Sequence, residues 1–188
     1  MFENPAYDPM TFNFGSDLLF SLAKVGPSLD AIDPDLRPLD RRGAKLIVNH
    51  GFSDPDISPL NTSNYFESVV DFMSHRHDDR EDALERTNQF FRLFMVPGMQ
   101  HCSGGPGPNT FDMLTALENW VERGEAPKRV IASHSTGGVV DRTRPLCVYP
   151  NVAVYTGSGS TNDAANFKCR NPREERDHRG HDDDNHDD

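Results

Sequence analysis

The sequence predicts an α/β fold built on a largely parallel sheet. Three short apolar runs, residues 44–49, 90–96 and 129–132, alternate with helical patterns over residues 62–74 and 111–123. Strands that alternate with amphipathic helices are typical of βα units, whose strands lie parallel in one sheet. A chain of 188 residues is long enough for one domain with its own core. We therefore expect one domain over residues 1–169 and a charged tail over residues 170–188.

The first 61 residues contain one well-defined strand signal. Residues 12–25 predict a short helix, and residues 30–42 predict a turn and a short helical piece ended by Gly43. Residues 44–49, AKLIVN, form a compact apolar and β-branched run. Such a run is typical of a strand buried on both faces, and this one stops at His50-Gly51 before a polar loop.

Two amphipathic helices are predicted around the second strand. Residues 62–74 place apolar side chains at helical spacing behind a Thr/Ser cap, and residues 75–85 predict an exposed loop. After the strand at 90–96, Asn109-Thr110 is expected to cap a helix over residues 111–123, which Gly124 ends in the left-handed conformation. The buried stripe expected on that helix is Met113, Leu114, Leu117, Trp120 and Val121.

The C-terminal part has weaker patterns. Residues 129–132 predict a last short strand, and residues 147–168 read as an irregular segment between two cysteines. Residues 170–188 contain no apolar side chain and carry a net charge of −4, from four arginines and eight acids. We expect this acidic tail to be disordered, because it has nothing to bury.

Composition excludes several classes of partner. The net charge of −11 argues against nucleic acid or an anionic membrane surface as a partner. No run approaches the roughly 20 apolar residues of a membrane span, and the N-terminus lacks the basic and apolar regions of a signal peptide. The three cysteines, Cys102, Cys147 and Cys169, contain no Cys-x-x-Cys pair, which argues against structural zinc.

Candidate catalytic groups follow two successive strands. Asp54 and Asp56 lie in the loop after the first strand, and His101 lies in the loop after the second, 47 residues beyond Asp54. Loops at the carboxyl ends of neighbouring parallel strands meet at one edge of a sheet. A carboxylate placed there can orient an imidazole that acts as a general base. The competing interpretation is a surface loop whose histidine is merely solvated.

Three segments resemble the C-terminal part of the tannase and feruloyl esterase family. They are DPDLRPLDRRGAKLIVNHGFSDPDISPLNTSNYFESV, FFRLFMVPGMQHCSGGPGPNTFDMLTALENWVERGEAP and RTRPLCVYPNVAVYTGSGSTNDAANFKC, which occur in the family's order and cover roughly residues 30–169. The resemblance implies the C-terminal portion of an α/β-hydrolase fold, with a mostly parallel sheet and flanking helices. It also implies a secreted or periplasmic hydrolase of aromatic carboxylic esters, galloyl or feruloyl.

The resemblance assigns roles to five residues. It implies that Asp54 is the acid and His101 the base of a Ser-His-Asp triad. From the residues alone, Asp56, two positions along in the same loop, is the rival acid. It implies that Cys102 pairs with a cysteine that precedes the nucleophilic serine, and that Cys147 pairs with Cys169. Closing that 22-residue separation would contribute about 3 kcal/mol in the chain-entropy model.

The serine expected of such an enzyme is not recognisable here. In α/β-hydrolases the chain order is serine, then acid, then histidine, so the nucleophile belongs before Asp54. The family's oxyanion-hole donors and calcium-bearing lid also belong upstream, so we expect no cofactor or metal in these 188 residues. We therefore expect a fragment that is inactive alone, with a non-catalytic remnant or binding module as the alternative. The oligomeric state is not predicted.

Other candidates have simpler explanations. Ser135, in Ser-Thr-Gly-Gly, lies after the histidine and lacks a preceding cysteine, so an ordinary Gly-Gly turn is expected. His50 is expected to be satisfied by backbone, although a hydrogen bond within the site is the alternative.

The remaining aromatic and histidine residues are expected to be structural or solvated. The aromatic residues Tyr65, Phe66 and Trp120 are expected in the core. The loop over residues 103–108 lacks the lysine of a phosphate-binding loop. The mixed His/Asp tracts are expected to be solvated; their histidines are His75, His77, His178, His181 and His186.

Overall fold

The computed structural model describes residues 4–74 and 79–172. Within the span predicted as one domain, the chain forms two compact units, residues 1–33 and 34–188, and each is described by itself. The first unit contains η1 (Pro9–Thr11) and α1 (Ser16–Leu29). The predicted helix over residues 12–25 is confirmed, but it begins and ends four residues later, since the side chain of Asn13 accepts the N–H groups of Gly15 and Ser16.

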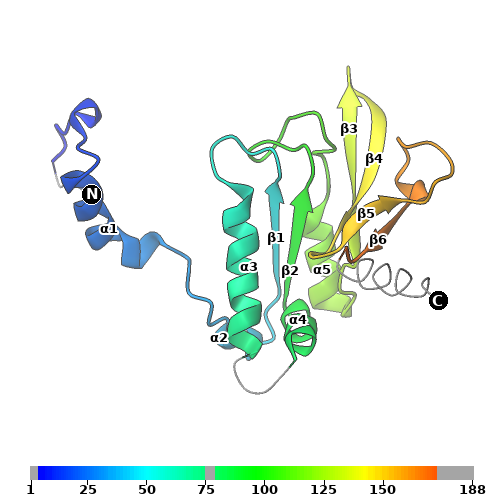
Figure 1. Cartoon of the computed structure of the whole chain (residues 1–188), viewed down its shortest axis with the longest axis horizontal. Coiled ribbons are helices and arrows are strands. Elements are labelled where there is room, and N and C mark those ends of the chain that lie inside the picture. Colours follow the sequence, from blue (N-terminus) through cyan, green and yellow to red (C-terminus); the bar gives the residue numbers. More distant parts are fainter. Residues whose placement is uncertain (1–3, 75–78, 173–188) are drawn as a thin grey trace, which may run out of the picture. The chain divides into compact units, whose positions relative to one another are not determined.

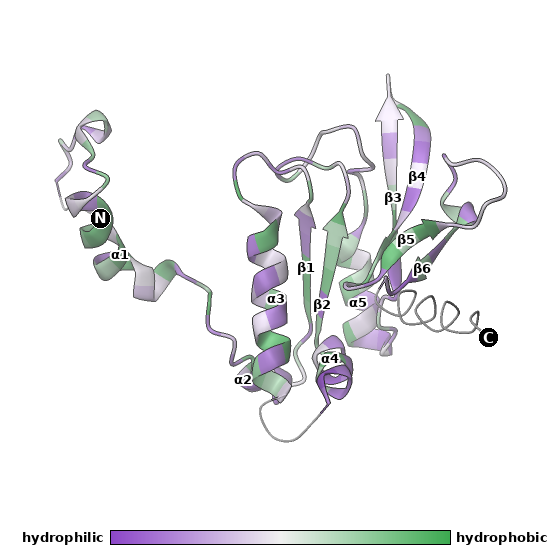
Figure 2. Ribbon diagram, viewed as in Figure 1, coloured by the Kyte–Doolittle hydropathy of each residue, from purple (hydrophilic) through white to green (hydrophobic). Residues whose placement is uncertain are grey.

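A parallel strand pair forms the centre of the second unit (Figure 1). After the short helix α2 (Arg37–Asp40), β1 (Leu46–Gly51) pairs with β2 (Phe91–Val96), in register from Leu46 opposite Phe91 to Gly51 opposite Val96. Side chains alternate between the two faces of such a pair, and in Figure 2 the carboxyl end of β2 is green (hydrophobic) while that of β1 is purple (hydrophilic). The parallel βα arrangement predicted for the first two strands is therefore confirmed.

Burial differs between the two strands. The apolar side chains of β2 at positions 91, 93, 94 and 96 are fully buried, whereas Ile47 and Val48 on β1 are half-buried. The expectation that the first strand is buried on both faces was wrong. The physical reason is that, within the described residues, β1 has a strand neighbour on one side only.

Two helices cover one face of the pair. The helix α3 (Pro59–Ser74) confirms the prediction for residues 62–74 and starts three residues earlier. Its buried side chains Phe66, Val69 and Val70 pack with Phe91 and Leu93 of β2. This face also contains Tyr65, so two of the aromatic residues predicted as core are core.

A helix occupies part of the predicted loop over residues 75–85. The helix α4 (Arg80–Asn88) begins behind Asp79, whose carboxylate accepts the N–H of Glu81, and it buries Ala83 and Thr87. Arg80 forms ion pairs with Glu67 and Asp71 of α3. The loop prediction failed from Arg80 onward because the helix is highly charged and buries only two small side chains. His75 and His77 lie outside the described residues.

The opposite face is covered by α5 (Met113–Arg123) and by a β-hairpin. The helix is confirmed, but Asp112, not Asn109-Thr110, caps it by accepting the N–H of Thr115, and Gly124 ends it at a φ of 71°. Trp120 is buried as predicted, whereas Leu114 and Val121 are 67% and 61% exposed, so the predicted stripe was too wide.

The third predicted strand does not join the parallel pair. Instead, β3 (Arg129–Thr136) pairs antiparallel with β4 (Val139–Cys147), a strand that the sequence analysis missed. Gly137 and Gly138, with φ of 60° and 83°, form the tight turn between them. The expected Gly-Gly turn after Ser135 is therefore confirmed, and it makes a hairpin rather than a βα unit.

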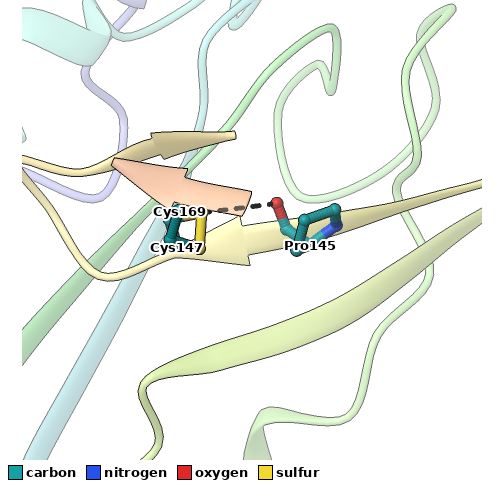
Figure 3. Close-up of a disulfide and its surroundings, with 3 residues drawn as sticks. All are labelled: Pro145, Cys147 and Cys169. Carbon is teal, nitrogen blue, oxygen red and sulfur yellow. Dashed lines mark hydrogen bonds between the residues drawn. A yellow bond between two sulfur atoms is a disulfide. The ribbon is translucent and has the colours of Figure 1, made fainter. Parts of the chain in front are cut away.

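A disulfide organises the last described segment. Here β5 (Val152–Tyr155) pairs antiparallel with β6 (Phe167–Arg170), which follows η2 (Ala164–Asn166). Cys147 at the end of β4 is bonded to Cys169 of β6, beside Pro145 (Figure 3). The segment over residues 147–168 is thus less irregular than predicted. Residue 170 is strand rather than disordered tail; the tail from residue 173 onward, with His178, His181 and His186, lies outside the described residues.

Candidate active site

Asp54 is held in a tight turn at the carboxyl end of β1. The strand ends at Gly51, and the N–H groups of Phe52 and Ser53 donate to the carbonyl oxygens of Val96, the last residue of β2, and of Met99 in the loop after it. The side chain of Asp54 is 3% exposed. Its Oδ1 accepts the N–H groups of Asp56 at 2.8 Å and Ile57 at 3.0 Å, so two backbone groups hold this oxygen.

His101 is delivered by the loop after β2. Pro97-Gly98 ends the strand, and the loop folds back so that the N–H of Gly107 donates to the carbonyl of Gly98 at 3.1 Å. The residue after the histidine, Cys102, has a φ of 60° and an exposed free thiol. Left-handed backbone at a non-glycine residue is uncommon, and it marks a sharp turn next to the histidine.

The two loops meet at the carboxyl edge of the parallel pair. Asp54 Oδ2 lies 2.8 Å from His101 Nδ1, although 47 residues separate them in sequence. An ionised carboxylate only accepts hydrogen bonds, so Nδ1 of His101 carries the hydrogen and donates it. The imidazole is 46% exposed, and in the part of the chain described here no partner is found for its Nε2. This nitrogen is therefore available to accept a proton.

The electrostatics of this pair favour the charged form of both groups. Burial alone would raise the pKa of Asp54, but the N–H groups of Ile57 and Asp56 and the imidazole of His101 outweigh it and hold this pKa well below its usual range. The hydrogen bond and charge of Asp54 raise the pKa of His101, with a smaller contribution from the charge of Asp56.

The rival acid Asp56 occupies a different position. It is exposed, and its backbone N–H rather than its carboxylate takes part in the hydrogen bonds of Asp54. The structure therefore brings Asp54, not Asp56, into hydrogen bond with the histidine.

His50 and Thr62 extend the constellation. His50 Nε2 lies 3.1 Å from Asp54 Oδ2, and His50 Nδ1 lies 2.6 Å from the hydroxyl of Thr62 in the first turn of α3. The expectation that backbone satisfies His50 was wrong, because both ring nitrogens face side chains. Thr62 was missed as a site residue, since it was read only as part of a helix cap. The signal was its place in the first turn of the helix that follows the Asp54 loop.

His50, Asp54 and His101 line a small hollow of about 180 Å³. Its walls are Asn49, His50, Gly51, Asp54, Ile57, Met99, His101 and Cys102. Two larger hollows, of about 470 and 320 Å³, lie between the loop after β2 and strands β4 and β5, and neither contains Asp54 or His101. Chemistry, rather than volume, therefore identifies the smaller one as the candidate active site.

The same residues offer donors for a cation. Among the described residues, Asp54, Asp56 and His101 each present one ligand atom, all within 4.8 Å of one another. Both oxygens of Asp54 already accept two hydrogen bonds each, so no lone pair is left to coordinate an ion. We assign no metal to this group.

Ser135 belongs to the β3–β4 hairpin. It pairs with Val140 across the hairpin, and its neighbour His134 is hydrogen-bonded at 2.6 Å to Asp141, not to Asp54.

Of the helices in the described residues, none is long and apolar enough to cross a membrane.

The fold and the Asp54–His101 pair define a class: an α/β protein that presents an acid and a base at one sheet edge. A family model described as "Tannase and feruloyl esterase" matches residues 3–170. The chain therefore belongs to the tannase and feruloyl esterase family.

Three similar proteins agree with this membership. The chain is 45% identical to the mono(2-hydroxyethyl) terephthalate hydrolase of Piscinibacter sakaiensis, over 87% of this chain and 27% of that protein. It is 30% identical to feruloyl esterase C of Talaromyces stipitatus, over 90% and 34% of the two proteins. The crystal structure of an esterase from Aspergillus oryzae superposes with a TM-score of 0.73 at 30% identity, covering 90% of this chain and 35% of that one. The chain thus spans about a third or less of these relatives' length.

Proposed function

We propose that this chain supplies the acid and the base of a carboxylic ester hydrolase that works through a Ser-His-Asp triad. The observation that carries the proposal is the 2.8 Å hydrogen bond between buried Asp54 Oδ2 and half-exposed His101 Nδ1. Because Nδ1 of His101 donates to Asp54, the other ring nitrogen, Nε2, is the one that can accept the proton of a serine hydroxyl. The nucleophilic serine belongs to a segment outside these 188 residues, because the triad order of the fold places it before the acid.

The proposed reaction proceeds in two proton-balanced halves. Nε2 of His101 accepts the proton of the serine hydroxyl while the serine oxygen forms a bond to the ester carbonyl carbon. The imidazolium then gives that proton to the departing alkoxide as the ester C–O bond breaks, which leaves an acyl-serine. A water molecule repeats the sequence and releases the carboxylic acid. Throughout, Asp54 stays ionised and stabilises the positive charge of His101.

The substrate class we propose is an aromatic carboxylic ester, galloyl or feruloyl. The names of the relatives support it: one is a terephthalate ester hydrolase and another a feruloyl esterase. The Cys147–Cys169 disulfide supports an oxidising location, secreted or periplasmic, for the parent protein. Exposed Cys102 beside His101 would then pair with a cysteine near the serine.

A chimera tests the proposal. Residues 30–170 of this chain replace the aligned segment of the terephthalate ester hydrolase, and methyl ferulate and methyl gallate are the test substrates. We expect His101→Ala and Asp54→Asn each to lower kcat about 10³- to 10⁴-fold, as for other triads. The matched controls, His134→Ala and Asp56→Asn, change the same residue types outside the pair and should stay within about threefold.

The chain of 188 residues is assayed alongside, and we expect no turnover from it alone. If the chain does turn over ester and Ser135→Ala abolishes that turnover, the proposal that the nucleophilic serine lies outside these 188 residues is contradicted. A chimera that hydrolyses the esters regardless of His101 and Asp54 would instead support the alternative, a remnant or binding module without a catalytic pair.

A further inference from the structure

His50 is placed between a hydroxyl and the carboxylate of the candidate pair. Its side chain is 13% exposed, with Nδ1 at 2.6 Å from Thr62 Oγ1 and Nε2 at 3.1 Å from Asp54 Oδ2. The oxygen that it contacts is the one that also accepts from His101. A continuous series of side-chain hydrogen bonds therefore runs from α3 through β1 to the two loops of the site.

The donors in this series follow from the charge of Asp54. Because an ionised carboxylate oxygen only accepts, both His50 Nε2 and His101 Nδ1 carry hydrogens. Neutral His50 then has an unprotonated Nδ1, which accepts the hydroxyl hydrogen of Thr62. Asp54 thus selects the His50 tautomer, and the hydroxyl of Thr62, which can donate, satisfies the other ring nitrogen and holds the imidazole in place.

We propose that His50, held by Thr62, is a positioning residue that fixes Oδ2 of Asp54 against His101. Backbone N–H groups hold Oδ1, and His50 is the side chain besides His101 that holds Oδ2, so His50 keeps this oxygen at hydrogen-bond distance from His101 Nδ1. The proposal rests on the proposed function only in that His101 is the base.

Few other side chains near the site could hold Oδ2 of Asp54. Among residues 4–74 and 79–172, the titratable side chains around the Asp54–His101 hydrogen bond are His50 at the end of β1, Asp56 in the Asp54 loop and Cys102 after His101. The helix that packs beside them, α3, contributes the uncharged Thr62 to this series. Of these, His50 is the one that donates to the carboxylate.

The first test needs no catalysis. The pKa of His101 is measured by nitrogen-15 NMR in the 188-residue chain and in its His50→Leu and His50→Gln variants, with circular dichroism to verify folding. We expect Leu to lower the pKa of His101 by about half a unit to one unit toward its ordinary value, since Oδ2 of Asp54 is no longer held against Nδ1 of His101. Gln, whose Nε2 can replace the donor, should restore the original value.

Matched variants separate positioning from general packing. His134→Leu removes a histidine that is hydrogen-bonded to a different aspartate, Asp141, and should leave the pKa of His101 unchanged. Thr62→Val should act in the same direction as His50→Leu, and Thr62→Ser should not. The proposal would be overturned if His50→Leu left the pKa of His101 unchanged, or if His50→Leu and His50→Gln shifted this pKa by the same amount.

The second test uses the chimera. We expect His50→Leu to lower kcat about 10- to 100-fold with KM unchanged, because misplacing a catalytic group costs on this order, and His50→Gln to stay within about threefold. If Asp54→Asn and His101→Ala abolish activity but His50→Leu leaves kcat unchanged, the positioning role of His50 is contradicted and the proposed function still stands. If no variant matters, the proposed function fails, while the NMR measurement still decides the role of His50.

Discussion

The carboxylate of Asp54 makes four hydrogen bonds although its loop is only a few residues long. Two come from backbone N–H groups of its own turn and two from imidazoles of β1 and the β2 loop. A buried charge is tolerated when it is hydrogen-bonded on every lone pair. The loop is therefore built around an ionised Asp54.

A pH dependence of stability follows from the histidine in this pair. The folded-state pKa of His101 is raised above its ordinary value of 6.5, mainly by the hydrogen bond that it donates to Asp54. Its contribution is fully present below about pH 6.5 and is lost as the pH rises through the folded-state pKa. We expect the free energy of unfolding, measured by urea titration, to fall over this window, and to fall less in His101→Gln. An identical pH slope in both proteins would contradict the coupling.

Sequence order alone could bring Asp54 and His101 together, because loops after neighbouring parallel strands share an edge. It could not choose the partners of His50. Those depend on how α3 is placed over the end of β1, which puts Thr62 at hydrogen-bond distance of a residue 12 positions earlier. Side-chain hydrogen bonds between elements are set by tertiary packing, and no local pattern encodes them.

At the scale of elements, Gly51 permits the two catalytic loops to approach each other. A Cβ at this position would lie 2.3 Å from the carbonyl oxygen of Gln100 and 2.5 Å from that of Met99. Both atoms are backbone of the loop that carries His101, so the loop would have to move away.

We expect Gly51→Ala to destabilise the chain by about 1–3 kcal/mol, the usual cost of overpacking, and to break the Asp54–His101 hydrogen bond. The readouts are thermal unfolding and loss of the upward displacement of the His101 pKa by NMR. Gly26→Ala is the control, because its Cβ would meet only the flexible side chain of Asp30. Equal effects of the two substitutions would argue against a specific approach of the loops.

The disulfide stabilises β5 and β6 through β4. Cys147 and Cys169 are 22 residues apart, and the segment between them buries few side chains, Val148, Ala164 and Phe167. We expect the Cys147→Ser/Cys169→Ser double variant to lose about 3 kcal/mol in urea unfolding. Cys102→Ser should leave the stability unchanged, since this thiol is free and exposed. A loss of less than about 1 kcal/mol would show that packing alone orders β5 and β6.

Helices and strands could be predicted where the apolar periodicity of their own sequence is strong. The prediction failed where pairing with another strand decides whether a segment is extended. The strand β2 and the helix α3 follow from their own sequences. The strand β4, VVDRTRPLC, contains four charged or hydroxyl residues in a row and a proline, so it resembles a loop. It is a strand because two left-handed glycines return the chain along β3. The same turn explains why the third strand did not extend the parallel sheet.

At the scale of the molecule, the parallel sheet has an open side. Across the described residues, β1 pairs with β2 alone, and its apolar residues Ile47 and Val48 are half-buried where those of β2 are fully buried. A strand edge with unpaired N–H and C=O groups is a template for another strand. The exposed residue Asn49 lies on this strand.

We therefore expect the 188-residue chain to self-associate through β1 at micromolar concentrations. Light scattering coupled to gel filtration should give a mass above the 21.1 kDa of the monomer. Asn49→Lys, which adds a charge on the exposed edge strand, should shift the mass toward the monomer, because edge lysines oppose strand pairing. The matched control is Asn119→Lys on α5, away from this edge. In the chimera, where the rest of a relative's chain is present, Asn49→Lys should lower expression or stability instead. A monomeric wild-type chain, or equal effects of the two lysines, would show that the edge is not the site of association.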